Sequence, residues 1–508
     1  MFSKLYSAAL LGMEACLISV EADVSDGLPQ MNMVGVLGTE VREAKDRVWT
    51  AIKNLGIRLP ARRITINLSP ADIRKEGTAF DLPIAAAVLM SFGYLPETFF
   101  KDTLLAGELG LNGQLCRING VLPIVFTASQ YGLKRCIIPK ENAKEGSMIK
   151  GIEVMGISTL QELIFLANEK KVWRPEKFSF CQTMSSKEVL DFSDVNGQKS
   201  AKRAIEIAVA GMHNLLMIGS PGSGKTMLAK RIPGIMPEFS FEECMEVSKV
   251  YSVAGLLNDK EGLIKNRPFR SPHHTLTSTA LIGGGRLPKP GEISLASHGV
   301  LFLDELTEFH KDTLEMLRQP LEEHQITISR IYGTYRYPAD FILVAAMNPC
   351  ACGYYPNRNF CHCTERQIYK YLNRVSRPFL DRIDLCVETQ PLEYEQLISK
   401  EKQESSREIR KRVEIARNLQ KERYQKEKIT CNGELTPQLI EKYIVLSKRE
   451  QNYLEEIFQR LSLTARSYHK IIKTARTIAD LEGSKEISLL HLSEAACYRS
   501  MDKKFWKQ

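Results

Sequence analysis

The sequence lacks several features that would mark a special class of protein. It has no uninterrupted apolar run of the roughly 18–20 residues that a membrane-spanning helix requires, so we expect no membrane partner. Its 12 cysteines are too few for a disulfide scaffold in a chain of 508 residues. It also has no internal repeat and no low-complexity tract. With 44% hydrophobic and 25% charged residues it has an ordinary globular composition, and its length predicts about three domains.

The start of the chain resembles a signal peptide only in part. Met1 to Lys4 is followed by apolar residues up to Val20, but Glu14 interrupts the run and no small-residue cleavage site follows it. We therefore expect a strand of the mature fold and a cytoplasmic protein. The formal charge of +9 permits a polyanionic partner without indicating one.

The sequence predicts an α/β fold in three parts, with a linker after the first. Residues 1–168 alternate short β-branched runs with helical periodicity, and residues 169–191 form a polar stretch typical of a linker. From 192 to 390, apolar strands alternate with helices, as in a parallel sheet with crossover helices. Residues 391–508 are helical in pattern.

A glycine-rich segment between a predicted strand and a predicted helix indicates nucleotide binding. Its backbone N–H groups converge on phosphates at a helix N-terminus, the lysine reaches the β- and γ-phosphates, and the threonine hydroxyl binds Mg²⁺. A chance glycine turn is the alternative. The eight residues of this P-loop are Gly219, Ser220, Pro221, Gly222, Ser223, Gly224, Lys225 and Thr226.

Two acidic residues follow the apolar run 300–303, at the expected ligand edge of the sheet. We expect Asp304 to hold Mg²⁺ and Glu305 to polarise the attacking water. The next predicted strand ends in Asn348, whose amide would orient that water, although an Asn before a proline is also typical of a turn. These residues predict an ATP- and Mg²⁺-dependent hydrolase.

These motifs, in this order, resemble the ComM/YifB branch of the magnesium-chelatase-like AAA+ ATPases. The resemblance implies a homo-hexameric ring with ATP at subunit interfaces, and nucleotide contacts from Val195, Gly197 and Gln198. It also implies a DNA helicase that promotes branch migration in homologous recombination or natural transformation, with single-stranded or branched DNA and recombination proteins as partners. The most specific stretches are 194–198, 267–275, 290–296, 345–350 and 475–481.

The resemblance also assigns two arginines. Arg382 would act in trans as an arginine finger, and Arg466 would reach the phosphate of its own subunit; either alone is more often a surface residue. The sequence departs from the family where Arg377 replaces the usual glycine, which makes Arg377 a second candidate finger. A further departure is Ala-Ser-His at 296–298 in place of the commoner Ala-His-Asn.

The N-terminal part resembles the Lon protease fold, which makes a protease the first rival function. Ala79 stands where Lon-type chemistry needs its serine, and Ile124 stands where it needs its lysine. Unless Thr78 finds an unexpected base, no acyl transfer is possible. We therefore expect a scaffold or a surface for partner proteins.

Four cysteines form two closely spaced pairs on a short stretch, 350–363. The pairs are typical of a closed, structural zinc site, with reduced thiols as the alternative. His362 lies between two of the cysteines and is not expected to bind the same ion. The predicted zinc ligands are Cys350, Cys352, Cys361 and Cys363.

Two stretches are candidates for gripping DNA phosphates. Residues 326–337 alternate around a glycine as a hairpin does, with Arg330, Tyr332 and Arg336 near its tip. Residues 270–289 resemble an inserted flexible loop that carries Arg286 and Lys289. Each could instead be a solvated surface loop. Two other functions therefore stay open: an ATPase that remodels a protein partner, and a nucleotide-regulated binding module.

Overall fold

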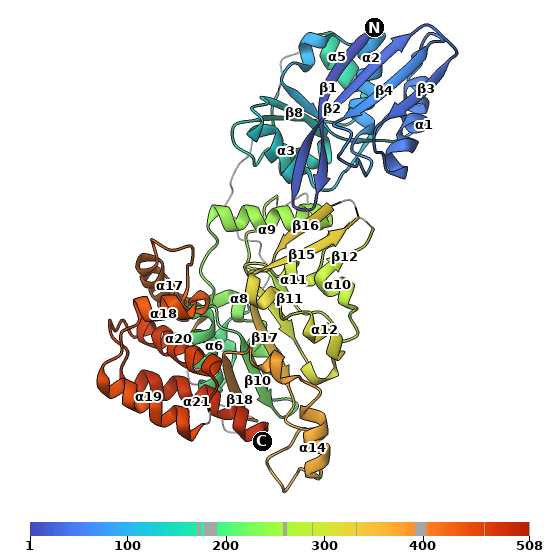
Figure 1. Ribbon diagram of the computed structural model, residues 1–508. Coiled ribbons are helices and arrows are strands. Elements are labelled where there is room, and N and C mark those ends of the chain that lie inside the picture. The colour runs from blue at the N-terminus through green and yellow to red at the C-terminus, as the bar shows by residue number, and fades with distance from the viewer. Residues whose placement is uncertain are drawn as a thin grey trace.

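The computed structural model describes residues 1–169, 174–176, 190–257, 262–286, 288–331, 333–391, 403–461 and 463–506. The molecule is elongated: an N-terminal α/β part, coloured blue to teal, sits above a central part in green and yellow, with orange and red helices at its side (Figure 1). None of the helices in the described ranges combines the length and apolar character that crossing a bilayer demands. The predicted α/β fold class is confirmed.

The N-terminal part contains a seven-stranded sheet in the order β3-β4-β2-β1-β5-β8-β9. The expectation of one strand from the start to Val20 is wrong, because Gly12, with φ +67°, turns the chain into an antiparallel hairpin. The sheet strands are β1 (Phe2–Leu11), β2 (Glu14–Ser25), β3 (Gln30–Val34), β4 (Arg63–Ser69), β5 (Thr103–Leu105), β8 (Arg135–Pro139) and β9 (Glu153–Ile157). A small pair consists of β6 (Glu108–Leu109) and β7 (Leu115–Cys116).

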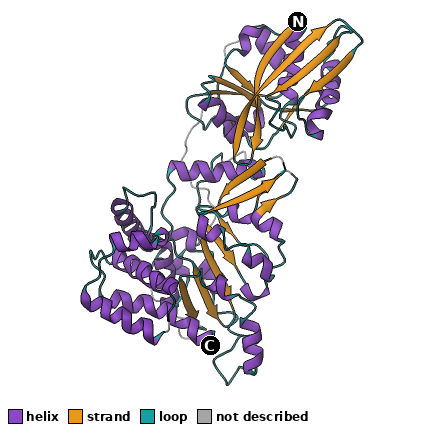
Figure 2. Ribbon diagram, in the orientation of Figure 1, coloured by secondary structure: helices purple, strands orange, loops and turns teal. Residues whose placement is uncertain are grey.

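Helices cover both faces of this sheet, as Figure 2 shows. Successive residues of β1 point to opposite faces, so Leu5 and Ala9 pack in one core with α2, and Ala8 packs in another with α3. The helix α2 lies in the core with all of its residues buried. The helices are α1 (Thr39–Asn54), α2 (Asp81–Ser91), α3 (Val121–Gln130), α4 (Ala143–Gly146) and α5 (Leu160–Asn168).

The central part contains a parallel five-stranded sheet in the order β11-β14-β17-β10-β18. Apart from the half-buried edge strand β11, its strands are buried on both faces, which explains the continuous apolar runs in the sequence. The strands are β10 (Leu215–Gly219), β11 (Phe269–Arg270), β14 (Val300–Leu303), β17 (Ile342–Met347) and β18 (Leu385–Thr389). Two hairpins project from it: β12 (Gly283–Gly284) with β13 (Lys289–Pro290), and β15 (Gln325–Arg330) with β16 (Gly333–Pro338).

Helices of the central part surround this sheet. They are α6 (Lys199–Gly211), α7 (Lys225–Ala229), α8 (Ile232–Ile235), α9 (Phe241–Ala254), α10 (Ser278–Ile282), α11 (Glu292–Leu295), α12 (Lys311–Glu315), α13 (Pro320–Glu323), α14 (Glu365–Leu372) and α15 (Arg377–Leu380). The stretch expected to be a flexible loop at 270–289 contains α10 and the β12–β13 hairpin.

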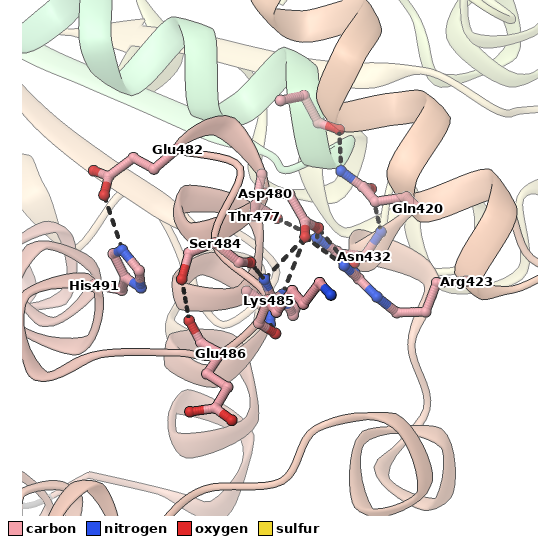
Figure 3. A network of polar contacts seen from close by, with 12 residues as sticks. Gln420, Arg423, Asn432, Thr477, Asp480, Glu482, Ser484, Lys485, Glu486 and His491 are labelled. Atoms are coloured by element: carbon pink, nitrogen blue, oxygen red, sulfur yellow. Dashed lines mark hydrogen bonds and ion pairs between the residues drawn. The ribbon is translucent and has the colours of Figure 1, made fainter.

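The C-terminal helices form a bundle held by a buried polar network (Figure 3). Asp480 is fully buried and accepts hydrogen bonds from Arg423, Arg476 and Asn432. Thr477 joins this network to His213 of the central part at 2.8 Å. The family-specific stretch 475–481 is thus explained by a structural role. The helices are α17 (Ser406–Arg423), α18 (Pro437–Tyr443), α19 (Lys448–Arg460), α20 (Ala465–Leu481) and α21 (Leu489–Phe505).

The N-terminal part is docked on α9 of the central part. One hydrophobic core contains Leu122 of α3 together with Cys244 of α9 and Leu257. Ser252 of α9 donates to the carboxylate of Glu145, whose pKa is raised by burial. The N-terminus of α3 also donates to Ser252, from Gly120 N to the carbonyl at 3.0 Å. The two parts therefore share a continuous, hydrogen-bonded interior.

Candidate nucleotide site

The P-loop follows β10 and wraps around the side chain of Lys225. The Lys225 ammonium donates to the carbonyls of Gly219 at 2.8 Å and Ser220 at 2.9 Å, and lies 3.2 Å from Asn348 Oδ1. Burial lowers the pKa of Lys225, and the Asp304 carboxylate opposes this effect. The sequence predicted Lys225 and Asn348 as partners at one site, and the structure brings them into contact.

Neighbouring segments fix the shape of the loop. A Cβ on Gly219 would lie 2.0 Å from Thr389 Oγ1, so only glycine fits where β10 passes β18. Gln198 donates to the Ser223 carbonyl at 3.1 Å from a left-handed backbone conformation, with φ +54°. The predicted segment at Val195, Gly197 and Gln198 therefore reaches the P-loop, although Val195 itself is fully buried.

The candidate magnesium ligands meet at the end of β14. Thr226 Oγ1 donates to Asp304 Oδ2 at 2.7 Å, which brings together the hydroxyl and the carboxylate that the sequence paired. Oxygen ligands of this kind suit Mg²⁺. Glu305 has a positive φ of +50°, and its carboxylate lies 3.5 Å from His274 Nδ1. The two acids thus diverge, Asp304 toward the P-loop and Glu305 toward the stretch 270–277.

The two predicted arginines share one carboxylate. Arg382 Nη2 lies 2.9 Å from Glu322 Oε1, and Arg466 contacts the same oxygen. Arg466 thus lies beside Arg382. The expected contact of Arg466 with the phosphate of its own subunit stays a prediction. Arg377, the other candidate finger, is exposed at the start of α15. Glu322 was missed by sequence reasoning, because no local pattern relates it to residues 60 and 144 positions away.

The four predicted zinc ligands converge. Cys350 Sγ lies 3.3 Å from Cys352 Sγ and 3.8 Å from Cys361 Sγ, and all four sulfurs lie within 4.8 Å of one another. Tetrahedral zinc with bonds of about 2.3 Å sets its sulfurs about 3.8 Å apart. The donor set and its spacing therefore fit a closed zinc site.

The cysteine loop touches the P-loop directly. A Cβ on Gly353, where φ is +86°, would lie 2.4 Å from Cδ and 2.8 Å from Cγ of Pro221. Asn348, which contacts Lys225, lies two residues before Cys350. The candidate metal site thus adjoins the nucleotide site at two points: the sequence itself indicates the proximity to Asn348, whereas the approach of Gly353 to Pro221 appears only in the structure.

The two candidate DNA stretches lie against each other. Arg330, at the end of β15, approaches the Gly285 carbonyl with its Nε at 3.4 Å. Lys289 is exposed on β13. The expectation that Arg336 lies near the hairpin tip is wrong, because Arg336 pairs with Thr327, three pairs back from Arg330 and Gly333, and the alternation of the strand sets it on the other face from Arg330. Arg286 lies 3.5 Å from Thr39 of the N-terminal part. Tyr332 falls outside the described residues.

The Lon-like region contains no acyl-transfer dyad among its described side chains. Thr78 donates to the Glu108 carboxylate, and Ile124 is fully buried at the position that Lon-type chemistry needs for lysine. The Glu108 carboxylate is too weak a base to take the proton from the Thr78 hydroxyl and make it a nucleophile. The contact is that of an ordinary hydrogen-bonded threonine.

A P-loop after β10 of a parallel five-stranded sheet, with its Thr226 hydrogen-bonded to Asp304 at the end of β14 and a helical bundle beyond, defines the class of AAA+ nucleoside triphosphatases. The chain also matches the families described as "Magnesium chelatase, subunit ChlI" over residues 191–397, "Subunit ChlI of Mg-chelatase" over 20–142 and "Magnesium chelatase, subunit ChlI C-terminal" over 403–499. It belongs to the ComM/YifB family of magnesium-chelatase-like AAA+ proteins, as its relatives show.

The "Competence protein ComM" of Haemophilus influenzae is 43% identical over 501 residues, which are 98% of this chain and 97% of that protein. The protein YifB of Salmonella typhimurium is 43% identical over 502 residues, again 98% and 97% of the two chains. "Lon protease 2" of Bacillus subtilis is 31% identical over 120 residues, 23% of this chain and 21% of the protease. The family suggests an ATPase, with ATP and Mg²⁺ as its cofactors.

Proposed function

We propose that the protein is an ATP-hydrolysing DNA motor that acts as a ring, a homo-hexamer, and promotes branch migration during recombination. The contact between Arg330 and the Gly285 carbonyl carries the proposal for DNA, because it brings the exposed Arg330 beside the segment that carries the exposed Arg286 and Lys289. The similarity to a competence protein also supports DNA as the substrate of the motor. ATP hydrolysis would drive movement of this surface.

Each residue of the nucleotide site has a role in hydrolysis. Lys225 neutralises phosphate charge, Thr226 and Asp304 hold Mg²⁺, and Glu305 orients and polarises the attacking water, with Asn348 aligning it. The metal supplies neutralisation of the phosphate oxygens. Arg382, or Arg377, would stabilise the transition-state charge on the nucleotide of a neighbouring subunit.

The DNA surface is tested by changing Arg330 and Arg336 together to alanine. Fluorescence anisotropy with single-stranded and forked DNA across a salt series should show weaker binding and a salt slope lower by about 1–2. A matched control changes Lys448 and Arg449, two exposed cations on α19, and should leave both unchanged. DNA binding and a salt slope that stay at the wild-type values in the Arg330 and Arg336 double variant would refute this surface.

Branch migration is tested with purified protein, ATP and a four-way junction. ATP-dependent conversion of the junction supports the helicase, and Lys225→Met should abolish it. Hydrolysis of ATP without saturable DNA binding at low salt would favour the other function, remodelling of a protein partner by a magnesium-chelatase-like ATPase.

We also propose one zinc ion per chain at the four cysteines. The sulfur spacing supports a structural ion, and so does the make-up of the group, which contains four cysteines and no further histidine or carboxylate from the described part of the chain. Elemental analysis of protein purified without chelator should find one zinc per chain, and Cys361→Ser should lose it. Protein purified without chelator that contains no zinc would refute the proposal.

A further inference from the structure

The carboxylate of Glu322 lies between the two arginines that the family resemblance singles out. Arg382 is only 7% exposed and is anchored through Nη1 to the Pro378 carbonyl and through Nε to the Arg318 carbonyl at 3.4 Å. Arg466, on α20, is 49% exposed. Glu322 Oε1 binds both guanidinium groups, so one oxygen joins the central part to the C-terminal bundle.

The cluster has more positive than negative charge. Arg318 lies near Arg382, and its own carboxylate partner is Glu315, at 2.9 Å. Three guanidinium groups thus face two carboxylates, and two of the three must share Glu322. Guanidinium binds best when two N–H groups meet two acceptor oxygens, an arrangement that a shared single oxygen does not provide. A terminal phosphate offers three oxygens and more charge, so it would satisfy both arginines more fully.

We propose that Glu322 is a latch that holds Arg382 and Arg466 in a resting position and is displaced by the terminal phosphate of a nucleotide on an adjoining subunit, so that Arg466 acts on the neighbouring nucleotide and not, as the family resemblance implies, on that of its own subunit. The proposal rests on the ring ATPase proposed above. Glu322 is 42% exposed, so an adjoining molecule can reach the cluster. Its role is to position the arginines, since it would not itself contact the nucleotide.

A purely structural role for Glu322 makes the opposite prediction. If the carboxylate merely holds the arginines in their working geometry, removing its charge should weaken ATP-dependent assembly and raise KM. If it competes with phosphate, removing its charge should strengthen assembly. The sign of the effect therefore separates the two roles.

The experiment measures ATP turnover by the full chain as a function of protein and ATP concentration. Glu322→Gln should lower the protein concentration for half-maximal turnover about three- to tenfold, the usual range for loss of one charge-assisted contact, with kcat changed less than about twofold. Glu322→Asp should retain most of the wild-type value. Glu323→Gln is the matched control: it removes the same charge from the same helix, where Glu323 accepts from Gln319 at 2.8 Å.

An unchanged or higher half-maximal concentration in Glu322→Gln would overturn the latch. So would an equal decrease in Glu323→Gln, because the effect would then come from net charge. Wild-type turnover per subunit that does not vary with protein concentration, down to concentrations at which the protein is a monomer, would overturn the ring ATPase and the latch together. In that case Arg382→Ala would also retain full turnover, which separates this outcome from failure of the latch alone.

Discussion

Replacing Gly353 with alanine tests whether the cysteine loop controls the shape of the P-loop. The new Cβ would lie 2.4 Å from Pro221 Cδ, about 1 Å short of the roughly 3.5 Å at which carbon atoms normally meet. The contacted atom belongs to a closed ring, so it cannot rotate away. Either the P-loop or the cysteine loop must therefore move by about 1 Å.

Two costs follow from this change. The positive φ of +86° costs an L-residue about 1–2 kcal/mol, which lowers stability. Displacement of the P-loop acts on catalysis, where a misplacement of about 1 Å can reduce the rate about 100-fold. We expect ATP turnover to fall by roughly that factor, with weaker nucleotide binding.

Gly132→Ala separates the two costs. Gly132 also has a positive φ, of +76°, but has no atom within 4 Å of its added Cβ. It should lose a similar amount of stability and keep full ATPase activity. Both variants are compared by thermal unfolding, fluorescent-nucleotide binding and steady-state ATP turnover. Wild-type turnover in Gly353→Ala, at a temperature where it is folded, would refute contact between the two loops as a determinant of catalysis.

Three further predictions concern other sites. Glu305→Gln should bind ATP normally but hydrolyse it orders of magnitude more slowly, as nucleotide binding and single-turnover assays would show. Ser252→Ala should lower the free energy of unfolding by about 1–3 kcal/mol in calorimetry, because Glu145 loses a buried donor. The pKa of His298 is raised because the hydrogen bond to Glu246 and the charge of Asp340 outweigh burial, which alone would lower it. The contribution of His298 to stability is thus complete below the ordinary imidazole pKa of about 6.5, and it declines as pH rises through the higher pKa of the folded state. Chemical denaturation from pH 6 to 9 should reveal this decline. The variant His298→Gln should lose this part of the pH dependence.

Local chemistry made much of the nucleotide site predictable. The P-loop depends on consecutive residues. Asp304 and Asn348 each follow an apolar strand, so their placement at the P-loop edge of the sheet follows from the geometry of parallel strands. The cysteine cluster was predictable because its ligands lie within 14 residues, 350–363. The alternation in 326–337 likewise predicted the hairpin that the structure confirms.

Contacts between distant segments could not be predicted in this way. Nothing near Glu322 in the sequence indicates two arginine partners, and nothing near Gly353 indicates Pro221. The turn at Gly12 was also missed, since apolar residues stand on both sides of this glycine and no typical turn sequence marks it. Each of these features depends on how separate elements pack, which periodicity does not encode.

The interior shared by α3 and α9 also bears on how this protein can be divided. A cut in the linker would separate the chain where the sequence changes character, but the apolar residues around Leu122 and Cys244 would remain buried against each other. Two fragments made separately would each expose that surface to water and would tend to aggregate. Made together, the fragments should reassemble into a nicked but intact protein. The N-terminal and central parts therefore fold as one unit, although the sequence predicts two domains joined by a linker.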